Sequence, residues 1–229
     1  MPNQVLAGTV TRILRQPGVE KISFTLNALT VSGAQYGQVA NAIDDGRITC
    51  ELAASFEAAP GQLAPGTVID AQYREKKNAM LFERQNFAST GLITEETSIV
   101  HEATHALFDL LTQKKGYRTL AIDDESAAFL AAALYIRRCG KNPKGWASFI
   151  DSPEYEALKL ADQMIAAEAD GQPFPLGPQT TQKLRDAVAK QYSFVRSADG
   201  TADDSGMIYV YDGVARCAAH GEPGRPVHR

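Results

Sequence analysis

Two histidines and a glutamate lie close together in the middle of the chain. The segment Ser98–Leu107 reads SIVHEATHAL and contains His101, Glu102 and His105 in an HExxH pattern. On an α-helix, residues i and i+4 project from the same face about 6 Å apart, so two imidazoles can share one zinc ion. Glu102 lies one position round the helix, within reach of a metal-bound water as a general base. The pattern therefore predicts a zinc site with hydrolytic chemistry.

A catalytic zinc site needs a third protein ligand and one open coordination position. The continuation HxxGxxH would supply a third histidine, but Phe108 and Leu111 stand at its glycine and histidine positions. Glu125, near the start of the next predicted helix, is the candidate ligand instead. Asp123 and Asp124 compete for this role, although Asp123 also fits the N-cap of that helix.

The spacing between the HExxH pattern and the downstream glutamate resembles that of the gluzincin group of zinc metallopeptidases. The resemblance covers Thr94–Arg138 and implies that His101, His105 and Glu125 hold one zinc ion. It further implies that Glu102 activates a zinc-bound water that hydrolyses peptide bonds, with a protein or peptide as substrate. The expected protein is thus a zinc metallopeptidase.

The chain departs from thermolysin-like members of that group around the third ligand. Their NExxSD pattern is missing, because Asp124 precedes Glu125, while Ala128 and Phe129 replace the Ser-Asp pair. Asp109, four residues after His105 on the same helix face, is the candidate for orienting a ligand histidine. A donor for the developing oxyanion is also expected, and the sequence does not choose among Tyr117, Arg118, Tyr135, Tyr155, Tyr209 and Tyr211.

Two alternative functions remain open at this point. One is a non-catalytic zinc-binding module derived from a peptidase, with a closed four-ligand site. The other is a secreted effector or toxin protease that cleaves one specific target. Neither the cleavage specificity nor the oligomeric state is indicated by the sequence.

The residues from 91 to 215 are predicted to form a helical zinc-binding part. Thr94 is the expected N-cap of the HExxH helix, and apolar residues at helical spacing carry it to a stop at Lys114–Gly116. Because that end lies far from His105, residues 117–122 are expected to return along the helix in extended form before a second helix ends near Arg138. Further helices are expected over 151–170 and 181–194, and a strand over 207–211.

Residues 1–90 are predicted to be strand-rich, so the expected fold class is α+β with a zincin-like helical part. Strands are expected within Val19–Leu29 and Arg47–Leu52, and a short helix over Tyr36–Asp45. A hairpin of Thr67–Tyr73 and Ala79–Glu83 could offer an edge strand to an extended peptide. Residues 216–229 are rich in Gly and Pro and are expected to form a flexible tail.

Bulk composition limits the remaining function classes. The chain has 229 residues and a formal net charge of −4, which gives no electrostatic case for nucleic-acid binding. Its three cysteines, Cys50, Cys139 and Cys217, are widely spaced and predict neither a disulfide framework nor a cysteine-based metal site. No signal sequence or membrane span is predicted. A cytoplasmic location is expected, with export by a route that needs no such signal left open.

Overall fold

The computed structural model describes residues 3–54, 56, 70–83, 93–111, 117–143, 146–147, 149–192, 208–211 and 213–214. It is a mixed α and β structure, in agreement with the expected α+β class. The predicted flexible tail, which contains Cys217, His220 and His228, lies outside the described residues. Among the helices that the structure describes, none has the length and apolar character needed to cross a bilayer.

The N-terminal part contains more helix than its predicted strand-rich character allows. It comprises α1 (Gln4–Leu14), α2 (Pro17–Glu20), β1 (Ser23–Leu26), β2 (Leu29–Ser32), α3 (Gly33–Asp44) and β3 (Thr49–Ala53). The expected short helix and strands are present, but α1 and α2 were not predicted. Asn3 caps α1 by accepting a hydrogen bond from the Leu6 amide, and α1 then buries Leu6, Val10, Ile13 and Leu14. Burial of this apolar stripe explains the helix.

A small sheet follows β3 and carries the predicted hairpin. Its strand order is β3-β5-β4, with β3 parallel to β5 (Ala79–Glu83) and β4 (Ala71–Arg74) antiparallel to it. A 3-10 turn, η1 (Glu75–Lys77), joins β4 to β5, and Asn78 completes the turn with a φ of 47°. Asparagine tolerates this left-handed conformation well. The hairpin prediction is confirmed, and among the described residues β4 is an edge strand of this sheet.

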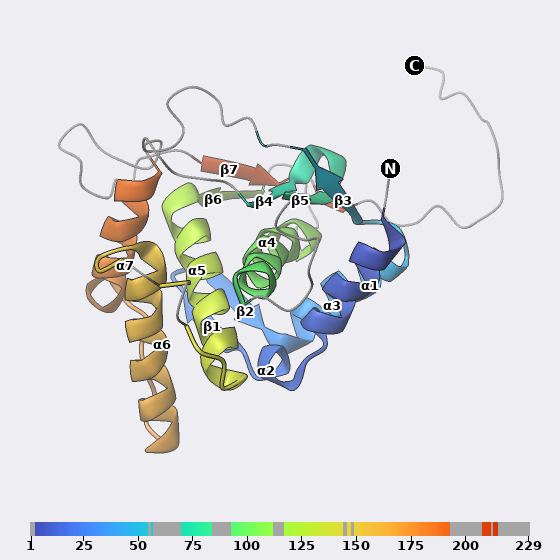
Figure 1. Cartoon of the computed structure of the whole chain (residues 1–229). Coiled ribbons are helices and arrows are strands. Elements are labelled where there is room, and N and C mark those ends of the chain that lie inside the picture. Colours follow the sequence, from blue (N-terminus) through green and yellow to red (C-terminus); the bar gives the residue numbers. More distant parts are fainter. Residues whose placement is uncertain are drawn as a thin grey trace, which may run out of the picture.

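The HExxH helix, α4 (Ile93–Leu111), runs through the middle of the molecule (Figure 1). It packs against α1, α3, β4 and α5. Because α4 begins at Ile93, Thr94 lies within the helix and is not its N-cap, contrary to the prediction. Residues 112–116, where the helix was expected to stop, lie outside the described residues.

The chain returns from α4 in extended form, as expected, and enters a second buried helix. The return is β6 (Tyr117–Leu120), which pairs antiparallel with β7 (Ile208–Tyr211). It leads directly into α5 (Ala121–Arg138), whose N-cap is Leu120. The expectation that Asp123 caps this helix is therefore wrong, since α5 starts earlier. On the outer side of α5 lie α6 (Pro153–Ala169) and α7 (Pro178–Gln191) (Figure 1).

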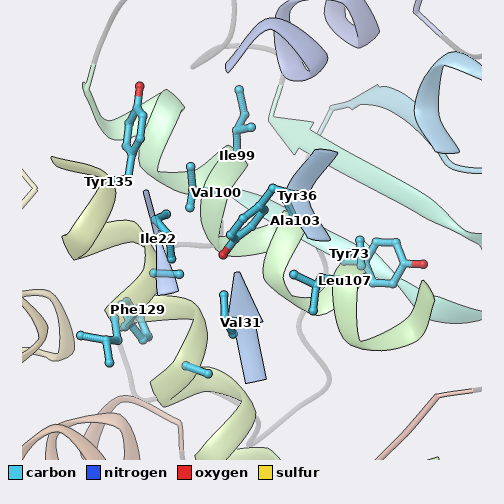
Figure 2. Close-up of a cluster of buried hydrophobic side chains, with 14 of the residues drawn as sticks. Ile22, Val31, Tyr36, Tyr73, Ile99, Val100, Ala103, Leu107, Phe129 and Tyr135 are labelled. Carbon is cyan, nitrogen blue, oxygen red and sulfur yellow. The ribbon is translucent and has the colours of Figure 1, made fainter. Parts of the chain in front are cut away.

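The hydrophobic core contains side chains from the predicted N-terminal part and from the predicted helical part of the chain. Figure 2 shows Ile22, Val31 and Tyr36 among side chains of α4 and α5. The buried hydroxyls of Tyr36 and Thr104 form a 2.7 Å hydrogen bond, and Thr104 donates to the Val100 carbonyl. The N-terminal part thus packs against α4 at Thr104, next to the predicted ligand His105 in the sequence.

Candidate metal centre

The two histidines of the HExxH pattern lie one helical turn apart on α4 and point in the same direction. Their ring centroids are 5.0 Å apart, with the planes at 72°. The ring of Phe129 from α5 packs edge-on against His101 at a centroid distance of 4.7 Å. Both imidazoles are largely shielded from solvent, with side-chain exposures of 13% for His101 and 10% for His105.

Glu125 reaches the two histidines from α5. Its Oε2 atom lies 3.3 Å from Nε2 of His101 and 3.8 Å from Nε2 of His105. Glu125 is the fifth residue of α5, near the start of the helix as expected. The extended return through β6 places the start of α5 beside the middle of α4, and this brings the three predicted ligands together.

These three side chains could hold a metal ion, and their donor atoms are of the kinds that zinc takes. Two imidazole nitrogens and one carboxylate oxygen, all within 4.8 Å of one another, form a group that could hold a metal ion. Ligand atoms at tetrahedral angles and about 2.1 Å from zinc would lie about 3.4 Å apart. The distances from Glu125 to the two histidines are close to that value. A three-residue ligand set also leaves one coordination position open, as catalytic zinc sites do.

Asp124 orients His105, the role expected of Asp109. The fully buried Asp124 forms a hydrogen bond through Oδ1 with Nδ1 of His105, and its Oδ2 accepts a 2.7 Å hydrogen bond from the Tyr211 hydroxyl. With Nδ1 engaged in this way, Nε2 faces Glu125 and the metal position. Asp123, the other candidate ligand, instead forms a buried ion pair with Arg185 of α7.

The charges around His105 favour its protonated form in the absence of a metal. Burial by itself would lower the pKa of His105, but the carboxylates of Asp124 and Glu125 raise it to about 10. A metal ion bound at Nε2 would therefore displace a proton. The carboxylates around His105 therefore stabilise a positive charge at this position, which either a proton or a metal ion can supply.

Glu102 lies beside the ligand group and contacts the edge of the small sheet. Its Oε2 accepts a 2.5 Å hydrogen bond from the backbone amide of Tyr73 in β4. Burial raises the pKa of Glu102, although positive charge on His101 and His105 acts in the opposite direction. A carboxylate with a raised pKa is a stronger base than an exposed one, as general-base catalysis requires.

Asp109 connects the C-terminal half of α4 to two other segments. Its Oδ2 accepts a 2.7 Å hydrogen bond from the Tyr73 hydroxyl, and its Oδ1 accepts a 2.8 Å hydrogen bond from the Gly213 amide. Asp109 is completely buried. The residue singled out by its position on the helix is therefore tied to the strand that holds Glu102.

Tyr192, directly after α7, is a site residue that the sequence did not reveal. Its hydroxyl hydrogen-bonds to Glu125, and burial together with the charges of Glu125 and Glu102 raises its pKa well above the ordinary value. Its ring lies edge-on to Phe129 at a centroid distance of 6.4 Å. The hydroxyl therefore keeps its proton, which it donates to Glu125. No local motif marks this tyrosine, because only packing of α7 beside α5 brings it here.

The residues that the sequence offered as oxyanion donors form other contacts where the structure describes their side chains. The hydroxyl of Tyr135 donates to Glu96 and Gln16, and Tyr155 lies beneath the amino group of Lys159 on α6. Tyr211 donates to Asp124. The side chains of Tyr117, Arg118 and Tyr209 lie outside the described part of the structure.

Comparisons with known proteins do not identify this chain: no protein-family model, curated protein or solved structure matches it. The resemblance to gluzincins therefore depends on the HExxH pattern and the downstream glutamate alone.

Proposed function

We propose that the protein is a zinc-dependent metallopeptidase of gluzincin type. The observation that carries this proposal is the grouping of His101, His105 and Glu125, with Glu102 beside them. The first three residues would hold the ion. Zinc there would supply a Lewis acid that polarises the scissile carbonyl and lowers the pKa of a water molecule.

The chain's own side chains have distinct roles in this reaction. Glu102 would take the proton of the attacking water and deliver it to the leaving amine. The Tyr192 hydroxyl would exchange its hydrogen bond to Glu125 for one to the oxygen on which negative charge develops. The phenyl ring of Phe129 and the burial of the ligands would limit the access of bulk water to this position.

The edge strand β4 supports a peptide as the substrate. Its Tyr73 amide points to Glu102 and not to β5, so this strand runs past the proposed base. An extended peptide that paired with the open side of β4 would bring its backbone to the metal position. A polypeptide in extended conformation is therefore the substrate class that the arrangement favours.

The test combines metal analysis with hydrolysis of a mixed peptide library by the wild type and by Glu102→Gln. We expect one zinc per chain in both proteins and a loss of roughly 10²–10⁴-fold in hydrolysis by the variant. Glu168→Gln on α6, whose side chain is 61% exposed, is the matched control and should behave as wild type. A wild type without zinc, or equal hydrolysis by both proteins, would contradict the proposal. Zinc without hydrolysis in either would favour a non-catalytic module.

A further inference from the structure

The strand β7 lies beside the start of α5 although it comes much later in the chain. It pairs antiparallel with β6, so that Tyr211 is opposite Tyr117 and Ile208 is opposite Leu120. Since β6 leads directly into α5, β7 packs next to the turns that carry Asp124 and Glu125 (Figure 1). Two groups of this segment, the Tyr211 hydroxyl and the Gly213 amide, then form hydrogen bonds to buried carboxylates of α5 and α4.

The first connection runs from Tyr211 to a proposed metal ligand. The Tyr211 side chain is buried, and its hydroxyl donates to Asp124, which in turn bonds Nδ1 of His105. Each hydrogen bond restricts the rotation of the next group. Together they hold the imidazole with Nε2 directed at Glu125. The His105 side chain is therefore already ordered before a metal binds, and binding costs little further side-chain entropy.

The second connection runs from Gly213 to the proposed base. The Gly213 amide and the Tyr73 hydroxyl bond opposite oxygens of Asp109, and the Tyr73 amide bonds Glu102. Gly213 has a φ of 86°, a conformation that residues with a side chain rarely adopt. The glycine therefore allows its amide to reach Asp109 and, through Asp109, fixes the part of β4 that contacts Glu102.

We propose that Tyr211 and Gly213 position the catalytic centre through two separate connections: Tyr211 sets the geometry of the ligand His105, and Gly213 sets the position of Glu102. This inference rests on the proposed function. Tyr211, Asp109 and Tyr73 are positioning residues in it, because they act through other side chains. The two connections make different predictions, since one ends at a metal ligand and the other at the base.

The test replaces three buried tyrosines by phenylalanine, which removes one hydroxyl and keeps the ring. Tyr211→Phe should weaken zinc affinity roughly 10–100-fold and leave kcat of the zinc-saturated protein close to wild type. Tyr73→Phe should leave zinc affinity unchanged and lower kcat roughly 10–100-fold, with KM little changed. Tyr135→Phe is the control, because its hydroxyl bonds Glu96 and Gln16, and Figure 2 shows it across the core from Tyr73.

Zinc affinity is measured by competition with a chromophoric chelator, and the visible spectrum of the cobalt-loaded proteins reports ligand geometry. Thermal unfolding shows whether each variant is folded. Wild-type zinc affinity and cobalt spectrum in Tyr211→Phe would overturn the first connection, and unchanged kcat in Tyr73→Phe would overturn the second. An equal effect of Tyr135→Phe would overturn both.

The outcomes of this test distinguish failure of the inference from failure of the proposed function. The affinity and the cobalt spectrum do not require hydrolysis, so the first connection is tested even if no peptide is cleaved. Absence of zinc binding in the wild type, by contrast, would contradict the proposed function itself and the inference with it. If Tyr211→Phe fails to fold, Asp124→Asn is measured in its place, and wild-type zinc affinity in that variant overturns the first connection.

Discussion

The hydroxyl of Tyr192 lies beside the proposed ligand Glu125 and is the donor that we propose for the developing oxyanion. It is hydrogen-bonded to Glu125, and its raised pKa keeps the proton in place. We expect Tyr192→Phe to lower kcat by roughly 10²–10³-fold while zinc content stays at the wild-type level, because a donor to the oxyanion acts mainly in the transition state. Steady-state kinetics on a cleaved peptide, together with metal analysis, provide the measurement.

Tyr155→Phe is the control for this prediction. Tyr155 was another candidate donor, but its ring lies beneath the Lys159 amino group on α6. Its replacement should leave kcat unchanged. If Tyr192→Phe lost zinc and retained kcat once reloaded, the hydroxyl would support the ligand Glu125 and would have no role in stabilising the oxyanion.

At the residue scale, contacts between residues close in the sequence could be predicted, and contacts between residues far apart in the sequence could not. The relation of His101, Glu102 and His105 follows from helix geometry alone, so their spacing in the sequence was sufficient. Tyr192 and the pairing of Asp124 with Tyr211 were missed, because they depend on contacts between segments remote in sequence. The 87 residues that separate Asp124 from Tyr211 carry no periodic signal of that contact.

At the scale of elements, α3 begins where it has almost no room for a side chain. A Cβ atom on Gly33 would lie 2.1 Å from the carbonyl oxygen of Glu20, at the end of α2. The Gly33 amide also donates to the Ile22 carbonyl. Backbone would have to move to relieve the clash, so we expect Gly33→Ala to lower the free energy of unfolding by about 1–3 kcal/mol, as overpacking typically does. Urea denaturation provides the measurement.

Gly37→Ala, in the same helix, tests whether this effect is steric. A Cβ atom there meets nothing within 4 Å, and Gly37 lies in the helix interior. Alanine is favoured over glycine at such a position by up to about 1 kcal/mol. The two substitutions should therefore change stability in opposite directions. Equal destabilisation by both substitutions would show that the close approach of Gly33 to Glu20 is not the cause of the stability loss in Gly33→Ala.

Elements with a strong local signal were predictable, and those held by tertiary packing were not. Ser152 and Pro153 mark the start of α6, and the Ser152 hydroxyl accepts the Tyr155 amide as an N-cap. The helix α1 gave a weaker signal, because its QVLAGTVTRIL sequence contains glycine and β-branched residues of low helix propensity. Burial of its apolar stripe against the core outweighs that propensity.

At the scale of the whole molecule, the proposed metal would join two central helices. His101 and His105 belong to α4 and Glu125 to α5, so the complete ligand set exists only in the folded chain. Free zinc at about 100 times its Kd should raise the free energy of unfolding by about 2.7 kcal/mol. For a chain of this size that corresponds to a rise in Tm of roughly 5–11 °C. Thermal melts in zinc buffers provide the measurement.

Glu125→Gln is the matched variant for this experiment. It keeps the size of the side chain but replaces the carboxylate ligand with an amide. The Tm of this variant should respond to zinc much less than that of the wild type. Removal of zinc by a chelator should lower the wild-type Tm to the value of the metal-free wild type. A wild-type Tm that is independent of free zinc would show that the ion does not bind the folded chain preferentially.

The late position of β7 also has a consequence for protein synthesis. The ribosome makes Asp124 87 residues before Tyr211. At translation rates of roughly 5–20 residues per second, about 4–17 s pass between the two. During that interval the nascent chain carries the histidines and Glu125 without the strand that orders them. We therefore expect the emerging polypeptide to bind the proposed zinc ion more weakly before β7 has been synthesised than after it.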